Sequence, residues 1–236
     1  IATADFQALV RDALRAKFPN VTDRTGKKQL SQLLSSGAGD ALRQMVIADP
    51  KLIGAKVSVP GLMSGDSDLY LKGYQADVTK TAGSADLTLA EDGESYAVTT
   101  TAPLTAGAVV RANGGALKII SAENGGAKTE IIEKPQSAGL VASGEWDTVL
   151  FSNSESDRRS SDREILWLES LKDQGLITKG FATRFFTSGD SRSPEMAGIR
   201  GALVGSLLVI AITLSICLPV GVAAALYLEE FAPKGR

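Results

Sequence analysis

The strongest constraint on this chain is an uninterrupted run of 28 residues, from Gly201 to Leu228, that contains no Asp, Glu, Lys or Arg. Fourteen of these residues are Leu, Ile or Val, the side chains that favour insertion into lipid. A hydrocarbon layer of about 30 Å is crossed by about 20 helical residues. The run would extend about 42 Å as a helix. It therefore predicts a transmembrane helix at residues 201–228, near the end of a 236-residue chain.

Small residues recur within this run at helical spacing. Gly201 and Gly205 lie four residues apart, as do Gly221 and Ala225, so the members of each pair share one face of the helix. A helix face made of small residues lets a second helix approach closely in a bilayer, although small residues are frequent in any transmembrane segment. Pro219 is tolerated there because neighbouring helices can satisfy the carbonyl group that it frees. We predict that these five residues pack against other helices and that the helix is kinked just before the proline.

The two ends of the run do not settle its orientation. Tyr227 and Phe231 suit an aromatic anchor at the C-terminal membrane interface. Basic residues flank the run on both sides, so a count of positive charges favours neither direction.

The first fifty residues have the spacing of amphipathic helices. The first helix is expected to end at Pro19, and a second is expected over residues 27–34, ending at Gly37-Ala38-Gly39. A third is expected over residues 40–49, with Asp40 as its N-cap. We interpret the apolar stripes as core packing. The first stripe consists of Phe6, Leu9, Val10, Ala13, Leu14 and Phe18.

Residues 52–152 change to short segments rich in Val, Ile, Thr and Leu, separated by turn-forming residues. Residues 87–89 and 96–99 flank an acidic turn that contains Gly93, which predicts one hairpin. Residues 117–120 and 129–132 flank Asn124-Gly125-Gly126, which predicts another. We expect a small antiparallel β unit with a modest core.

Helical spacing returns over residues 161–186. Ser161 and Glu164 have the spacing of a capping box, and Ile165, Leu168 and Leu171 follow on one face. The predicted fold class is therefore α+β followed by one transmembrane helix. The expected domains are an α+β domain at 1–180, a juxtamembrane linker at 181–200, the span at 201–228 and a polar end at 229–236.

No part of the sequence predicts a catalytic, cofactor-binding or metal site. Histidine is absent, which removes the commonest general base and metal ligand. Gly26-Lys27-Lys28 lacks the earlier glycine of a phosphate-binding loop, and Asp66-Ser67-Asp68 lacks the later positions of a calcium loop. We interpret Asp190 and Glu195 as an ordinary charged loop. The net charge of −2 gives no basis for nucleic-acid binding.

Several segments carry a resemblance to a known family. Near the span they are residues 185–199 (FFTSGDSRSPEMAGI), 205–206, 218–225 (LPVGVAAA) and 226–234 (LYLEEFAPK); upstream they are 11–19 (RDALRAKFP), 33–38 (LLSSGA) and 49–54 (DPKLIG). These segments resemble PstA, the permease subunit of bacterial phosphate ABC transporters, in the branch with a long N-terminal extension. The middle of the chain, residues 75–153, is much less specific.

The resemblance implies a location, partners and a substrate. Residues 1–198 would form a periplasmic, extracytoplasmic domain, and residues 229–236 would lie in the cytoplasm of a bacterium, beneath its inner (plasma) membrane. The whole protein would cross the membrane several times, so we expect this chain to be a piece of it. Its partners would be a second permease subunit of the PstC type, a cytoplasmic ATPase dimer and a periplasmic phosphate-binding protein. The chain itself would not be an enzyme, and no phosphate-contacting residue can be assigned.

Two other classes of protein are alternatives. A single-pass or tail-anchored membrane protein would use the polar domain as a sensor or protein-binding module. A soluble hydrolase is disfavoured by the missing histidine and by the apolar run.

Overall fold

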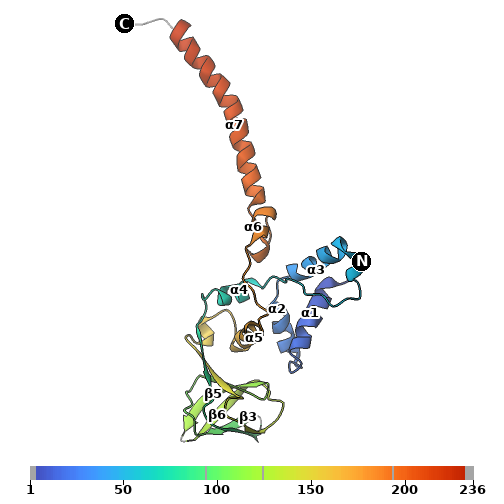
Figure 1. Cartoon of the computed structure of the whole chain (residues 1–236). Helices are drawn as coiled ribbons and strands as arrows, with labels where there is room; N and C mark the ends of the chain where they lie inside the picture. The colour runs from blue at the N-terminus through green and yellow to red at the C-terminus, as the bar shows by residue number, and fades with distance from the viewer. Residues whose placement is uncertain (1–3, 94, 124, 193, 232–236) are drawn as a thin grey trace, which may run out of the picture. The chain divides into compact units, whose positions relative to one another are not determined.

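The computed structural model describes residues 4–93, 95–123, 125–192 and 194–231 (Figure 1). The chain divides into two compact units, unit 1 at residues 1–178 and unit 2 at residues 179–236. Unit 1 combines helices with an antiparallel sheet, and unit 2 contains the apolar helix. The predicted α+β class with one C-terminal apolar helix is confirmed.

Unit 1 begins with helix α1 (Phe6–Lys17), where a helix was predicted. The Asp5 side chain caps it by accepting a hydrogen bond from the Ala8 amide at 2.9 Å. Leu14 is buried, but Leu9 is 55% exposed. The interpretation of the whole apolar stripe as core is therefore wrong for Leu9 and for Ala13, which is also exposed, because the neighbouring elements cover only part of this face.

The next two helices begin earlier than predicted. Helix α2 (Arg24–Gln32) begins where Asp23 accepts a hydrogen bond from the Gly26 amide at 2.6 Å. Helix α3 (Gly37–Ala48) includes the glycines that were expected to end α2, so Asp40 lies in its first turn and is not its N-cap. The early start of α3 has a tertiary cause: the Gly39 amide donates to Gln7 Oε1 of α1 at 2.8 Å.

Two short elements follow that were not predicted. They are a 3-10 turn, η1 (Pro50–Leu52), and helix α4 (Gly65–Leu71). Ser64 caps α4 by accepting from the Ser67 amide, and Asp66 and Asp68 fall in the first turn. Acidic residues are favourable there because the first turn has a positive electrostatic potential.

One eight-stranded, wholly antiparallel sheet fills the middle of unit 1. Its strand order is β1-β8-β4-β5-β6-β3-β2-β7. The strands are β1 (Val78–Ala82), β2 (Leu87–Asp92), β3 (Ser95–Thr100), β4 (Val109–Ala112), β5 (Gly115–Glu123), β6 (Gly126–Glu133), β7 (Gly139–Val141) and β8 (Asp147–Phe151).

Both predicted hairpins are confirmed. Leu87 pairs with Thr100 in the β2–β3 hairpin, and Ile119 pairs with Thr129 in the β5–β6 hairpin. The sheet is larger than the small unit expected, and its core is more extensive. One buried cluster draws on residues from β2 through β7, including Leu89 and Val110, and on Trp146, which directly precedes β8.

Helix α5 (Asp162–Asp173) lies between the sheet and the N-terminal helices, after a 3-10 turn, η2 (Glu155–Asp157). Its predicted capping box is present. Leu166 packs on Val109, Ala116 and Val149 of the sheet. The adjoining side of α5, which includes Trp167, packs with residues of α1, α2 and α4. Because α5 is buried against both sets of residues, it is the central element of unit 1.

Unit 2 contains helix α6 (Thr183–Thr187), a 3-10 turn η3 (Pro194–Met196) and helix α7 (Arg200–Leu226). A π-helical turn, η4 (Tyr227–Phe231), continues α7. The segment expected as a linker therefore contains a short helix and a turn of its own.

Candidate functional site

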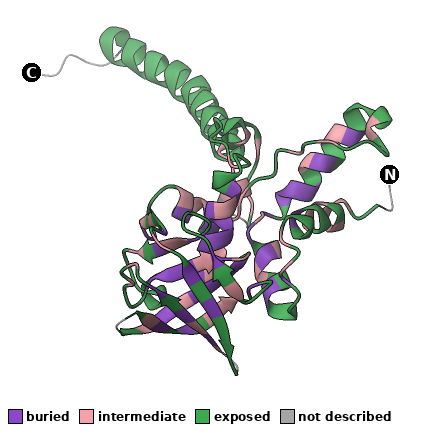
Figure 2. Cartoon of the chain, turned by 60° about the horizontal axis from the view of Figure 1, so that its bottom comes forward, coloured by how far each residue is buried: buried purple, intermediate pink, exposed green. Residues whose placement is uncertain are grey.

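The first candidate site is helix α7 with its continuation, a 32-residue helical segment from Arg200 to Phe231 that is apolar enough to cross a membrane. Each described residue of this segment is exposed (Figure 2). A core helix of a water-soluble protein would be largely buried, and a signal sequence would lie near the N-terminus. Neither explanation fits this segment, so an apolar surrounding is required to cover it.

The five predicted helix-packing residues all lie in α7, and all five are exposed. A Cβ atom added at Gly201, Gly205 or Gly221 would meet no described atom within 4 Å. These glycines are therefore not required for packing within the described part of the chain. Pro219 lies inside the helix without ending it. Whether the five residues contact other helices stays a prediction.

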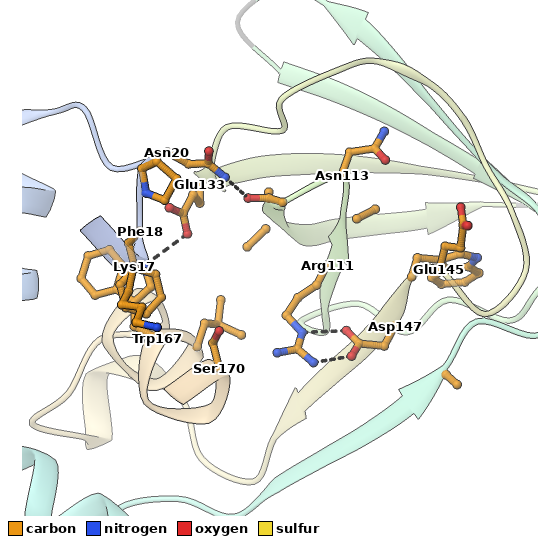
Figure 3. A pocket seen from close by; sticks show the side chains of 18 of the residues that line it. Lys17, Phe18, Asn20, Arg111, Asn113, Glu133, Glu145, Asp147, Trp167 and Ser170 are labelled. Carbon is orange, nitrogen blue, oxygen red and sulfur yellow. Dashed lines mark hydrogen bonds and ion pairs between the residues drawn. The ribbon is translucent and has the colours of Figure 1, made fainter. Parts of the chain in front are cut away.

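The second candidate site is a cavity of about 520 Å³ in unit 1 (Figure 3). Its walls come from the segment after α1, the β4–β5 turn, the start of β8 and one face of α5. The lining residues with polar or aromatic side chains include Phe18, Asn20, Arg111, Glu133, Asp147 and Trp167.

Two of the charged side chains that line this cavity, Arg111 and Asp147, pair with each other. The Arg111 guanidinium donates two hydrogen bonds to the Asp147 carboxylate, one of them from Nε to Oδ1 at 2.7 Å. Glu133 accepts from the Trp167 indole nitrogen at 3.2 Å. Burial raises the pKa of Glu133, and the indole hydrogen bond opposes that shift. The charge of Arg111 is therefore balanced by the Asp147 carboxylate. The charge of Glu133 is less fully compensated, because its hydrogen-bond partner is a neutral indole.

The same cavity is held open by side chains that join distant loops. Asn20 donates to the Gly114 carbonyl oxygen at 2.8 Å (Figure 3). It also accepts a hydrogen bond from Gln136 at 2.9 Å. These contacts fix the segment after α1 against the β4–β5 turn. The arrangement offers polar groups around a modest space, without a nucleophile positioned by a base. Among the described residues, no three acidic, cysteine or histidine side chains gather as a metal site.

A buried charge network lies on the side of α5 that faces β1 and α4. The Glu169 carboxylate accepts from Tyr70 Oη at 2.8 Å and pairs with Lys80 at 2.8 Å and with Lys172 at 3.1 Å. Burial alone would raise the pKa of Glu169, but these three partners more than offset it and lower the pKa. Burial and the same carboxylate raise the pKa of Tyr70. The network ties three elements together and has a structural role.

The sequence contains a signal for the cavity wall that our prediction did not use. Asn113 and Gly114 both adopt positive φ angles, 49° and 69°, in the two-residue turn between β4 and β5. Asn-Gly between two apolar segments is typical of such hairpins. This turn places Arg111 in β4. The pairing of Arg111 with Asp147 joins β4 to β8, and no local pattern indicates it.

Comparison with known proteins gives one finding. Residues 1–80 match a family described as a domain of unknown function, DUF3333. The match covers helices α1 to α4 and the start of β1, about one third of the chain. Neither the curated proteins nor the solved structures contain a match.

Proposed function

We propose that this chain is part of the permease subunit of an ABC transporter that imports inorganic phosphate across a bacterial inner membrane. The observation that carries the proposal is a folded polar unit joined to an exposed helix long enough to cross a bilayer. The juxtamembrane sequence at residues 185–199, which resembles PstA, supplies the substrate and the transporter class.

In this proposal unit 1 lies in the periplasm and residues 229–236 lie in the cytoplasm. Helix α7 packs beside helices of the same subunit and of a PstC-type partner, and it shifts with them when the ATPase dimer closes. A periplasmic phosphate-binding protein delivers the ion. The chain contributes no hydrolytic chemistry of its own.

Phosphate uptake provides the test. Cells that lack the gene for this chain should take up labelled phosphate more slowly at low external phosphate, and the restored gene should recover the rate. Uptake of labelled sulfate is the matched control, because sulfate is also a tetrahedral oxyanion and should be unaffected. Equal phosphate uptake with and without the gene would contradict the proposal.

Purification separates the proposal from its main alternative. In mild detergent, a permease subunit should co-purify with an ATPase and a second multi-span protein. A single-pass sensor or binding module should purify without either, and phosphate uptake should then be independent of the gene.

A further inference from the structure

Three phenylalanines in α6 and just before it form an exposed group, which we call the aromatic cluster. Phe181, Phe185 and Phe186 are 81%, 44% and 54% exposed. The rings of Phe181 and Phe186 are stacked with centroids 6.1 Å apart, and those of Phe185 and Phe186 meet edge to face at 5.3 Å. Three exposed aromatic rings in contact form an apolar surface that is unfavourable in water.

Backbone hydrogen bonds hold the aromatic cluster beside the first turn of α7. The Ile199 amide donates to the Phe185 carbonyl oxygen at 2.9 Å, and the Arg200 amide donates to that of Ser188 at 3.3 Å. The Gly198 amide donates to the Gly189 carbonyl oxygen at 2.8 Å, and this hydrogen bond joins the two ends of the loop between them. A Cβ atom at Gly198 would collide with the carbonyl oxygens of Ser188 and Phe185, so glycine permits this close approach. The rings are therefore fixed near the level at which α7 begins.

The length of α7 places that level at the edge of the hydrocarbon layer. The charge-free run exceeds the roughly 20 residues needed to cross the layer, so about one turn at each end reaches the headgroup region. At the C-terminal end this region contains Tyr227 and Phe231, whose rings are 6.4 Å apart. Residues 200–210 contain no aromatic residue. The aromatic cluster is positioned to supply the missing aromatic groups at the N-terminal end.

We infer that the aromatic cluster is a membrane-interface anchor whose rings lie in the glycerol-ester layer of the bilayer. This inference rests on the membrane assignment of α7 and is independent of phosphate as the substrate. Aromatic and apolar side chains with basic neighbours favour this layer.

The charges around the aromatic cluster complement lipid headgroups. Residues 179–200 contain four basic and two acidic side chains. The basic ones are Lys179, Arg184, Arg192 and Arg200. Lys179, Arg192 and Arg200 are exposed, and Arg184 is half-buried. Basic side chains at this depth attract the phosphate groups of anionic lipids.

Depth-dependent fluorescence quenching tests the anchor directly. The whole chain is placed in vesicles of phosphatidylcholine with a minority of phosphatidylglycerol. Phe185→Trp and Phe186→Trp are measured separately, and the emission of the unsubstituted chain, which has Trp146 and Trp167, is subtracted. One lipid set carries a nitroxide on the headgroup, and the other carries bromine deep in the acyl chain.

The headgroup nitroxide should quench the added tryptophans at 185 and 186 at least about twofold more strongly than the deep bromine does. Leu214→Trp, in the middle of α7, is the reference and should show the reverse order. If Leu214→Trp is quenched by bromine but neither cluster tryptophan is quenched by either lipid, the anchor is contradicted while the span stands. If Leu214→Trp is not quenched at all, the membrane assignment fails and the anchor fails with it.

A glycine pair tests whether the hydrogen-bonded loop sets this depth. Combined with Phe185→Trp, Gly198→Ala should reduce the headgroup quenching, because the added methyl group forces the loop apart. Gly180→Ala, where a Cβ would meet no described atom within 4 Å, should leave the quenching unchanged. Equal quenching in both variants would contradict the role of the loop.

Discussion

Asp23 joins two helices that are far apart in the sequence. Its carboxylate caps α2 through the Gly26 amide and forms two hydrogen bonds with Arg163 of α5, at 2.8 and 3.1 Å. The Arg163 hydrogen bond is the largest influence on its pKa, which is lowered to about 2 although partial burial opposes the shift. The charged form of Asp23 is therefore favoured in the folded state.

Because the folded pKa lies below the usual aspartate value of 3.8, this stabilisation is present above about pH 4 and is lost as the pH falls through about 2. Asp23→Asn should lower the free energy of unfolding by about 1 kcal/mol at pH 7, a value reduced for the half-exposed carboxylate. Urea unfolding of the whole chain in detergent, followed by the fluorescence of Trp146 and Trp167, measures this loss. The difference should shrink as the pH falls through about 2. Asp12→Asn, at an exposed α1 ion pair, is the control and should have little effect at either pH.

Glu169 provides a second prediction at this scale. Glu169→Gln removes a carboxylate, only 5% exposed, on which Tyr70, Lys80 and Lys172 converge. The expected loss is about 2 kcal/mol, below the full cost of breaking a buried pair because Lys80 keeps Asp173 at 2.7 Å. The folded pKa of Glu169 is lowered, so the effect should be full above the unfolded pKa and should decline as the pH falls through the folded one.

Asp173→Asn is the matched control, since Asp173 pairs with the same lysine but is about half exposed. Its cost in the same unfolding assay should remain below about 1 kcal/mol. If both variants lose the same free energy of unfolding, the burial of Glu169 does not make its contribution to stability larger than that of Asp173.

Short-range chemistry explains which residue-level predictions succeeded. The capping box of Ser161 and Glu164 was predictable because both partners lie within one turn. The hydrogen bond from Gly39 to Gln7, which moves the start of α3, joins residues 32 positions apart. No local pattern indicates that contact, and the same is true of Asp23 with Arg163.

The same division holds at the scale of elements. The β2–β3 and β5–β6 hairpins were predicted because each turn lies between its own two strands. The pairing of β1 with β8 joins opposite ends of the β-rich region, so it depends on the assembled sheet. The cavity borders β4, β8 and α5, and it could not be predicted without that pairing.

Helix α7 permits a matched test of the predicted helix-packing face. Ala225→Leu enlarges a small residue on the face shared with Gly221, and Ala223→Leu makes the same change two positions away, on roughly the opposite face. Both residues are exposed, so neither change disturbs packing within the described chain. In the proposed permease, Ala225→Leu should reduce co-purification of the second permease subunit several-fold, and Ala223→Leu should not. Equal recovery with both variants would contradict the assigned face.

At the scale of the whole molecule, the two units need different solvents. Unit 1 buries three apolar clusters and covers its sheet with α5. Unit 2 presents the large side chains of α7 to its surroundings. The sequence predicted this contrast because it depends on the distribution of charge along the chain and not on any tertiary contact.

The contrast leads to a prediction for a chain cut after Thr178. The cut retains Ile177, which packs with the cluster around Trp167, and removes the exposed helix. Residues 1–178 should therefore form a monomer in buffer that unfolds cooperatively in urea, whereas the whole chain should sediment with membranes and require detergent. Analytical ultracentrifugation with and without detergent distinguishes the two. A whole chain that stays monomeric in buffer would mean that its own surface covers α7, and the transmembrane assignment would then be wrong.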